Sequence, residues 1–282
     1  MSRNTKISII TINYNNDSGL ERTIKSIEEQ KSSSCEFIVI DGGSNDNSLN
    51  IINKYKSLIT SFVSEKDKGI YNAMNKGIDK ATGDYILFLN SGDYFYDNTI
   101  LSKNIQLIKD FDLIAFDINL YGEGFNIIHK NPDKLSFSFI FLETLSHQSV
   151  FIKRELFKRI GYYDDSLEIV ADWKFFIHAI MSGCSYKNYN ITLSSFEFGG
   201  VSTTGEGVKT RIKERERVIK NEFPFFYEGF KGLEDYKRLS NLNRFKLLKE
   251  IEHDKFGKKL FSILFRIYIL FFSRKKIKNI LK

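Results

Sequence analysis

The sequence predicts an α/β protein in which a mostly parallel sheet carries helices on both faces, followed by an amphipathic helical tail. Strand patterns alternate with helix patterns from the N-terminus onward, which is typical of a parallel sheet. The strand segments are almost continuously apolar, as in strands that are covered on both faces. Small polar residues follow these strands, and in such sheets ligands bind at the carboxyl ends of the strands.

The first strand is expected over residues 6–13 (KISIITIN), and the next over residues 36–40 (EFIVI). Between them, a helix is indicated by three aliphatic residues at helical spacing, namely Leu20, Ile24 and Ile27. The second strand ends abruptly at Asp41, which is followed by a Gly-Gly pair and several turn-forming residues.

A second helix and strand follow at residues 70–80 and 85–89. The strand runs into the turn Asn90-Ser91-Gly92-Asp93, so Asp93 and Asp41 are expected on one edge of the sheet. One carboxylate beside two very small residues suits a hard-oxygen metal site with room for a diphosphate. An ordinary structural turn is the alternative.

Several segments in order carry a family resemblance: SIITINYNN, IVIDGGSNDNS, E-x-D-x-G-I-Y-x-A-M-N-K-G, GDYILFLNSGD, HQSVFI and ADWKFF. Together they resemble the inverting, nucleotide-sugar-dependent glycosyltransferases of family 2, which have the Rossmann-like GT-A fold. The bacterial branch that builds capsule, O-antigen and exopolysaccharide is the most similar. The resemblance implies a GT-A domain over residues 1–222, with a nucleotide-sugar-binding half (1–110) and an acceptor half (111–222).

The donor site is expected around Asp41, which could accept a hydrogen bond from a uracil N–H or a ribose hydroxyl. Gly42 would allow the backbone to approach the ligand closely. Asp46 is open to two interpretations, a helix cap and a ligand contact. The resemblance places the base-binding floor at Thr11, Asn13 and Tyr14.

Asp67 lies just before the 70–80 helix, where it could cap the helix or face the nucleotide. The resemblance implies the second role, with Lys76 nearby on the helix. It also implies that Asn90, Ser91 and Gly92 contact the nucleotide sugar.

For Asp93 the resemblance implies a ligand to Mg²⁺ or Mn²⁺, which neutralises the diphosphate leaving group. The common form of this motif is acidic at both its first and last positions, whereas here only the last position is acidic. The diphosphate itself is therefore expected to supply most of the metal ligands.

In the acceptor half, Asp172 opens a helix, where an aspartate commonly acts as a cap. The resemblance implies instead that Asp172 is the catalytic base that takes the proton of the acceptor hydroxyl. His147 and Gln148 are candidate contacts to the acceptor or the metal, and a histidine with a purely structural role is the alternative. The glycine-rich segment 198–207 is either a loop over the nucleotide or a connector.

Charge is concentrated in the tail, which is assigned to residues 223–282. Residues 255–282 hold 9 Lys or Arg and no acid, while the rest of the chain has 33 bases against 35 acids. The apolar run over residues 260–272 is 13 residues long, too short to span a membrane, and helical spacing predicts a helix in the membrane interface. Packing of this helix on the catalytic domain is the alternative. The apolar residues at helical spacing that predict this interface helix are Phe256, Leu260, Ile263, Ile267 and Leu270.

Other features exclude several classes. The apolar segment after residue 6 is only a strand long, which predicts no signal peptide, and Cys35 and Cys184 are too few for a disulfide framework or zinc site. Nucleic-acid binding would explain the bases of the tail but not its many apolar residues.

The expected function is inverting transfer of a hexosyl or N-acetylhexosaminyl group from a nucleotide sugar, with UDP favoured, to a lipid-linked or oligosaccharide acceptor. The enzyme is expected in the cytoplasm, at the inner face of the cell membrane. A nucleotidyltransferase and a non-catalytic, membrane-associated sugar-nucleotide-binding subunit are the alternatives.

Overall fold

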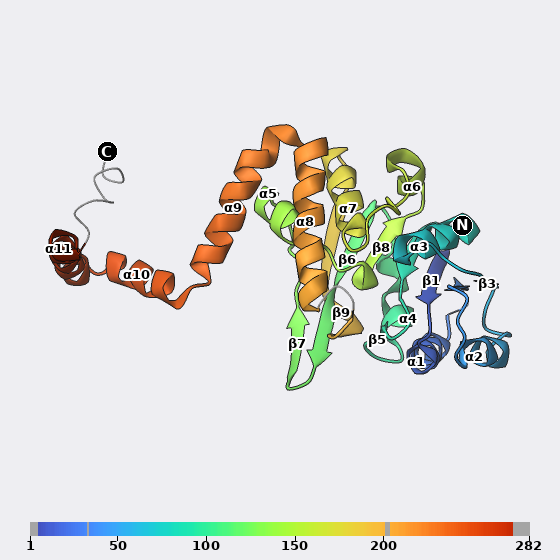
Figure 1. Cartoon of the computed structure of the whole chain (residues 1–282). Coiled ribbons are helices and arrows are strands. Elements are labelled where there is room, and N and C mark those ends of the chain that lie inside the picture. Colours follow the sequence, from blue (N-terminus) through green and yellow to red (C-terminus); the bar gives the residue numbers. More distant parts are fainter. Residues whose placement is uncertain (1–4, 33, 201–203, 273–282) are drawn as a thin grey trace. The chain divides into compact units, whose positions relative to one another are not determined.

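The computed structural model describes residues 5–32, 34–200 and 204–272. The chain divides into two compact units, Met1–Pro224 and Phe225–Lys282. In the first unit, the described residues form a nine-stranded sheet with helices on both faces (Figure 1).

The first half of the sheet has the strand order β3-β2-β1-β4, and its strands are all parallel. These strands are β1 (Ile7–Asn13), β2 (Cys35–Asp41), β3 (Ser61–Ser64) and β4 (Tyr85–Phe88). The connecting helices are α1 (Asp17–Glu29), α2 (Ser48–Lys54) and α3 (Ile70–Lys80). The register places Asn13 beside Asp41 and Asp41 beside Ser64, so the polar strand ends meet at one edge.

The second half of the sheet is mixed. Its strands are β5 (Tyr94–Phe95), β6 (Leu113–Gly122), β7 (Phe125–His129), β8 (Val150–Lys153) and β9 (Tyr186–Glu197). The strand β8 runs antiparallel to both β4 and β6, whereas β6 and β9 are parallel. The three strands expected to be parallel, β1, β2 and β4, lie in the first half, where the unpredicted β3 extends the sheet; β8 joins this half to the mixed half.

Both faces of the sheet are packed, as the continuous apolar strands predict. Alternate strand residues such as Ile7, Ile9 and Val39 pack with apolar residues of α1 and α2 on one face. On the other face α3 approaches β1 so closely that a Cβ on Gly77 would lie 2.5 Å from Cγ2 of Ile10. Figure 1 shows α1 and α2 on one side of β1 and α3 on the other.

The remaining described helices of this unit follow β5, β7, β8 and β9 in the chain. They are α4 (Ile100–Asn104), α5 (Phe137–Leu142), α6 (Glu155–Ile160), α7 (Ala171–Met181) and α8 (Gly205–Glu222), with the short 3₁₀ helices η1 (Ile105–Leu107) and η2 (His147–Ser149). Near its C-terminus, α8 is joined to α7 by an ion pair of Glu222 with Lys174 (2.5 Å) and by a hydrogen bond of Glu222 with His178 Nε2 (2.8 Å). His178 thus contributes to the contact between α7 and α8.

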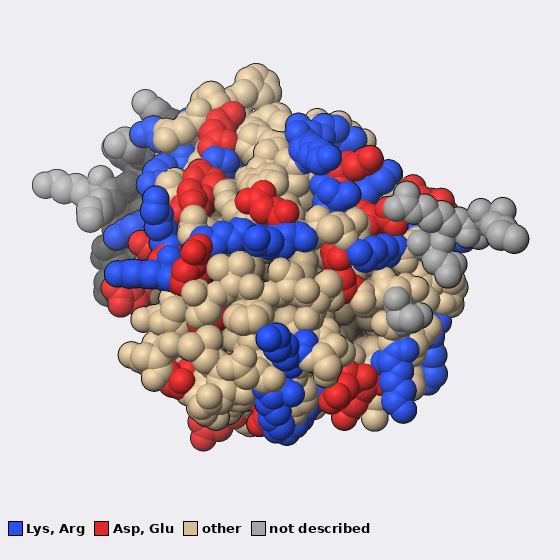
Figure 2. Space-filling view, turned by 90° about the vertical axis from the view of Figure 1, so that its right-hand side faces the viewer, with Lys and Arg blue, Asp and Glu red and all other residues tan. Residues whose placement is uncertain are grey.

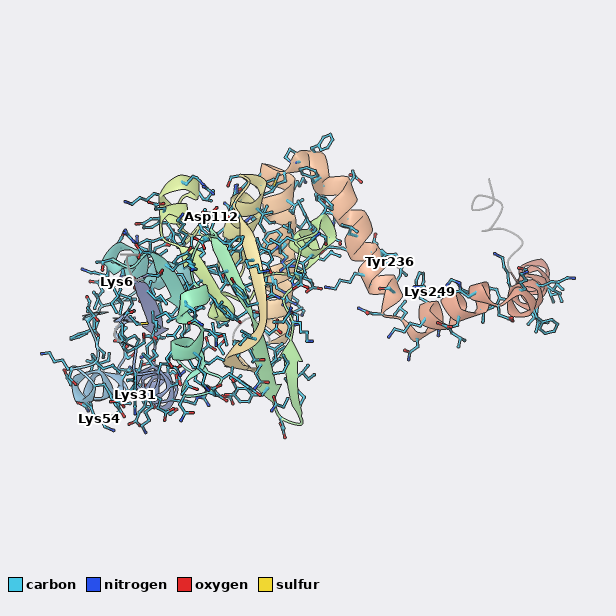
Figure 3. All side chains as sticks on the ribbon, turned by 180° about the vertical axis from the view of Figure 1, so that it is seen from behind. Lys6, Lys31, Lys54, Asp112, Tyr236 and Lys249 are labelled. Atoms are coloured by element: carbon cyan, nitrogen blue, oxygen red, sulfur yellow. The ribbon has the colours of Figure 1, made fainter. Side chains whose placement is uncertain are left out.

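The second unit contains three helices in its described part, where the sequence predicted one amphipathic tail. After the 3₁₀ helix η4 (Pro224–Phe226), they are α9 (Tyr227–Ser240), α10 (Asn243–His253) and α11 (Lys255–Phe272). Figure 3 labels Tyr236 on α9 and Lys249 on α10. The predicted basic residues beyond 272 and the side chain of Leu270 lie outside the described residues.

Apolar side chains are exposed along α11, including Phe256 (75%), Leu260 (47%) and Ile263 (49%). Within the described segments, no helix has the length and apolar character needed to cross a membrane. On the face shown in Figure 2, Lys and Arg side chains are interspersed with Asp and Glu.

Candidate active site

Asp41 lies at the carboxyl edge of the sheet, where its carboxylate holds the loop that follows β2. It accepts four hydrogen bonds, from Asn13 Nδ2 (2.9 Å), Ser44 Oγ (2.5 Å), Ser44 N (3.0 Å) and Ser64 Oγ (2.7 Å). Burial favours the neutral acid, but these hydrogen bonds outweigh it and lower the pKa of Asp41. Asp41 and Asn13 thus shape the loop, and a contact of either with the nucleotide stays a prediction.

Three predicted donor-site residues adjoin one another beside this loop. A Cβ on Gly42 would lie 3.2 Å from both Tyr14 Cδ2 and Asp67 Oδ2, so the backbone here passes close to both side chains. The ring of Tyr14 is 67% exposed and is free to pack against a planar group. Thr11, by contrast, is buried and donates to the carbonyl oxygen of Leu89 (2.6 Å), joining β1 to the segment after β4.

Asp67 pairs with Lys76 of α3, with Oδ1 and Nζ 2.6 Å apart. Lys76 also pairs with Glu65 (2.7 Å). The N-cap position of α3 is occupied by Gly69, so Asp67 does not cap this helix. Asp46 does accept from the backbone N–H of Ser48 at the start of α2 (3.0 Å), and its other oxygen accepts from the N–H of Asp17 (3.0 Å).

The turn over residues 90–93 is fixed by α1, which the sequence did not reveal. Thr23 Oγ1 donates to the carbonyl oxygen of Asp93 (2.7 Å) and accepts from the N–H of Gly92 (3.0 Å). Arg22 donates to the carbonyl oxygen of Gly92 (2.8 Å), and Ser91 Oγ donates to that of Asn16 (3.1 Å). Gly92 has φ +105°, which favours glycine at this position.

The carboxylate of Asp93 is buried, and this burial raises its pKa to about 7 despite the nearby positive charge of His147. The side chain of Gln148 hydrogen-bonds to it. Beside it, the Oδ1 atom of Asn90 is buried without a hydrogen-bond partner. One carboxylate with a neighbouring amide oxygen suits Mg²⁺ or Mn²⁺ when other oxygens come from elsewhere. In the described part of the chain, no group of three or more His, Cys, Asp or Glu could hold a metal ion.

Asp172 lies in the first turn of α7, where three donors surround its buried carboxylate. Oδ1 accepts from Tyr71 Oη (3.0 Å) and from the N–H of Trp173 (2.8 Å), and Oδ2 lies 2.9 Å from His147 Nδ1. Burial alone would raise the pKa of Asp172, but the hydrogen bond and charge of His147 lead the contributions that lower it. The carboxylate is therefore held ionised, as a proton acceptor must be. Val170 occupies the N-cap position of α7.

His147 connects the two halves of the site. Its Nδ1 faces Asp172 and its Nε2 lies 3.2 Å from Nδ2 of Asn90. Burial would lower the pKa of His147, but the hydrogen bond and charge of Asp172, together with the charge of Asp93, raise it. His147 and Gln148 thus place one side chain against Asp172 and one against Asp93. Tyr71 is a further member of this group that sequence reasoning missed, because its apolar ring fits the buried face of α3 equally well.

A family model described as "Glycosyl transferase family 2" matches residues 8–163. The chain belongs to glycosyltransferase family 2. The matched range contains the turn over residues 90–93 and His147 but ends before Asp172. Membership establishes the activity in general terms, as glycosyl transfer from a nucleotide-sugar donor.

Relatives that are named glycosyltransferases agree with this assignment. A PGL/p-HBAD biosynthesis glycosyltransferase of Mycobacterium bovis is 31% identical over 211 residues, which cover 70% of this chain and 79% of that protein. An uncharacterized glycosyltransferase of Haemophilus influenzae is 27% identical over 249 residues, covering 82% and 98% respectively.

Solved structures show that this glycosyltransferase has the GT-A fold. S. aureus TarS residues 1–349 in complex with UDP-GlcNAc superimposes with a TM-score of 0.60 at 18% identity, covering 77% of this chain and 67% of that one. The chain spans only 40% of a longer TarS structure. A mannosyltransferase from Pyrobaculum calidifontis, in complex with GDP-Man and Mn²⁺, has a TM-score of 0.57 at 13% identity and covers 96% and 89%.

Proposed function

We propose that this glycosyltransferase inverts the anomeric carbon of a UDP-sugar and transfers a hexosyl or N-acetylhexosaminyl group to a lipid-linked glycan in bacterial surface-polysaccharide synthesis. One observation carries the catalytic part of the proposal. Two buried carboxylates are joined through adjacent residues: Asp172 lies 2.9 Å from His147 Nδ1, and Asp93 is hydrogen-bonded by the side chain of Gln148.

Asp172 is the proposed general base. It accepts the proton of the acceptor hydroxyl while that oxygen attacks the anomeric carbon on the side opposite the diphosphate. Tyr71 and His147 hold the carboxylate ionised and fix both of its oxygens. A single displacement of this kind inverts the configuration at the anomeric carbon.

Asp93 is the proposed ligand to Mg²⁺ or Mn²⁺ on the diphosphate side. When bound, the cation would neutralise charge on the diphosphate as the sugar–oxygen bond breaks. The buried carboxylate of Asp93 and the unpartnered Oδ1 of Asn90 beside it support this assignment. Thr23 and Arg22 keep the turn in place from behind.

The donor contacts proposed for Tyr14, Gly42 and Asp67 rest on their close grouping beyond the carboxyl ends of β1, β2 and β3. UDP is favoured because TarS, of the same fold, forms complexes with UDP and with UDP-GlcNAc. The lipid-linked acceptor and a peripheral position at the inner face of the membrane rest on the exposed apolar residues of α11 and on the basic tail. The relative from M. bovis is named for PGL/p-HBAD biosynthesis.

The decisive experiment measures slow hydrolysis of a panel of nucleotide sugars by the full chain, with Mn²⁺ or with EDTA. The proposal expects metal-dependent release of UDP from one or a few UDP-sugars, and release of the inverted free sugar. Binding of UDP-sugars without any turnover would instead favour a non-catalytic subunit. That alternative is motivated by the 90–93 turn, in which only the last residue is acidic. Release of pyrophosphate from a nucleoside triphosphate and a sugar phosphate would indicate a nucleotidyltransferase.

A further inference from the structure

The segment that precedes Asp172 is held by a buried acid of α8. Glu214 is 8% exposed, and its two carboxylate oxygens accept from the backbone N–H groups of Glu168 (2.8 Å) and Ile169 (3.0 Å). A buried carboxylate is costly unless it is hydrogen-bonded, and charge-assisted bonds of this kind are stronger than neutral ones. Glu214 therefore fixes the backbone at residues 168–169.

That backbone is in direct contact with the partner of the proposed base. The hydroxyl of Tyr71 lies 2.6 Å from the carbonyl oxygen of Ile169 and 3.0 Å from Oδ1 of Asp172. One hydroxyl proton is thus shared between two acceptors. The position of the Ile169 carbonyl oxygen, which depends on Glu214, therefore affects the strength of the hydrogen bond from Tyr71 to Asp172.

Arg215, the next residue of α8, contacts the end of α5 and the first turn of α7. Its guanidinium donates to the carbonyl oxygens of Leu142 (2.8 Å) and Glu143 (3.2 Å), and its Cζ lies 4.8 Å from the centre of the Trp173 ring. Trp173, which follows Asp172, donates from Nε1 to the carbonyl oxygen of Ile140 (2.8 Å). Successive residues of α8 therefore contact the segment before α7, through Glu214, and the first turn of α7, through Arg215.

We propose that Glu214 is a positioning residue for Asp172, acting through Ile169 and Tyr71. The inference rests on the proposed function, in which Asp172 is the base. A displacement of about 1 Å at a reacting group can cost on the order of 100-fold in rate. Loss of the two bonds at residues 168–169 should therefore slow the chemical step, while Tyr14 and Gly42 of the proposed donor site, which lie outside this series of contacts, keep their affinity for the nucleotide.

The test compares Glu214→Ala and Glu214→Gln with Glu222→Gln in the full chain. Glu222 is a matched control because it lies on the same helix and contacts the same α7, but through Lys174 and His178. Affinity for UDP with Mn²⁺ is measured by calorimetry, and kcat and KM by hydrolysis of the UDP-sugar that the panel identifies. Trp173 is the only tryptophan of the chain, so ¹⁹F NMR of protein containing 5-fluorotryptophan reports on the residue beside Asp172.

We expect kcat to fall about 10- to 100-fold in Glu214→Ala, with KM and UDP affinity within about twofold of the parent. Glu214→Gln keeps one acceptor oxygen, so its kcat should lie between those of Glu214→Ala and the parent. The ¹⁹F resonance should move in both Glu214 variants and stay in place in Glu222→Gln.

The inference is overturned if Glu214→Gln keeps the parent kcat while thermal unfolding shows that the variant is folded. It is also overturned if the affinity for UDP falls by as much as kcat does. An unmoved ¹⁹F resonance also overturns it. If Glu214→Ala does not fold, Glu214→Gln decides. Asp172→Asn separates this inference from the proposed function. If Asp172→Asn keeps full turnover, the assignment of Asp172 as the base is wrong. If Asp172→Asn is slow but the Glu214 variants are not, the base assignment stands and the role of Glu214 is wrong.

Discussion

The Nδ1 atom of His147 lies 2.9 Å from Oδ2 of Asp172, although the two residues belong to different elements, η2 and α7. The other nitrogen of the same ring faces Asn90 in the turn that carries Asp93. A single imidazole therefore relates the proposed base to the proposed diphosphate site. Its position also explains why the pKa of His147 is raised, against the effect of burial, by two acids.

Asp93→Asn should weaken metal-dependent binding of UDP while leaving the fold intact. Burial raises the pKa of Asp93 to about 7, so a neutral amide is accommodated at this position without loss of stability. Calorimetry with UDP and Mn²⁺, repeated with EDTA, measures the metal-dependent part. Equal affinity in parent and variant would remove Asp93 from the metal site.

Asp172→Asn should bind donor normally and lose turnover by about 10²- to 10⁴-fold, the usual contribution of a positioned proton acceptor. Asp165→Asn serves as a control, since Asp165 is exposed and hydrogen-bonds to Asn72 (3.1 Å). Loss of donor affinity or of folding in Asp172→Asn would indicate a structural role instead.

Glu36→Gln should destabilise the first unit in a pH-dependent manner. Burial opposes ionisation of Glu36, but hydrogen bonds from Lys6, Ser8 and Thr82 lower its pKa to about 2. Because the folded pKa lies below the usual value of about 4.3, the stabilisation is present above pH 4.3 and is lost as the pH falls toward 2.

Urea unfolding at pH 7 should therefore show a loss of about 2 kcal/mol in Glu36→Gln, from hydrogen bonds to a charged group. The difference between parent and variant should shrink between pH 4 and pH 2. A difference that is constant over this range would show that the charge of Glu36 is not responsible.

Gly77→Ala should destabilise the protein by about 1–3 kcal/mol, as overpacking of a core does. A Cβ at this position would lie 2.5 Å from Cγ2 of Ile10, so either α3 or β1 must shift. Gly229→Ala, in α9 with no atom within 4 Å of the added Cβ, should be neutral or stabilising. Equal effects of the two substitutions in thermal unfolding would contradict close packing of α3 on β1.

Removal of residues 255–282 should preserve donor hydrolysis but abolish sedimentation with anionic vesicles. The attraction combines apolar insertion with roughly 1 kcal/mol for each Lys or Arg near the surface, so salt should weaken it without eliminating it. Leu260→Ser with Ile263→Ser tests the apolar part alone, since both side chains are exposed on α11. A truncated chain that still sediments, or that no longer folds, would rule out an anchor.

The sequence by itself determined three parallel strands of the first half of the sheet, β1, β2 and β4, and the edge at which the site lies; β3 was not predicted. Continuous apolar strands alternating with amphipathic helices allow few arrangements other than a covered parallel sheet, so Asp41 and Asp93 had to emerge on the same side. The family resemblance, rather than helix spacing, implied that Lys76 lies near Asp67, and the two side chains do pair (2.6 Å).

Only the tertiary structure decided which partners these residues have. The apolar pattern of β8 is the same for either strand direction, so its antiparallel pairing with β4 and β6 could not be read from it. Thr23 behind the 90–93 turn, Tyr71 and His147 at Asp172, and Glu214 at residues 168–169 come from distant parts of the chain. Periodicity describes which face of an element is buried, whereas hydrogen bonds between elements depend on how those buried faces pack together.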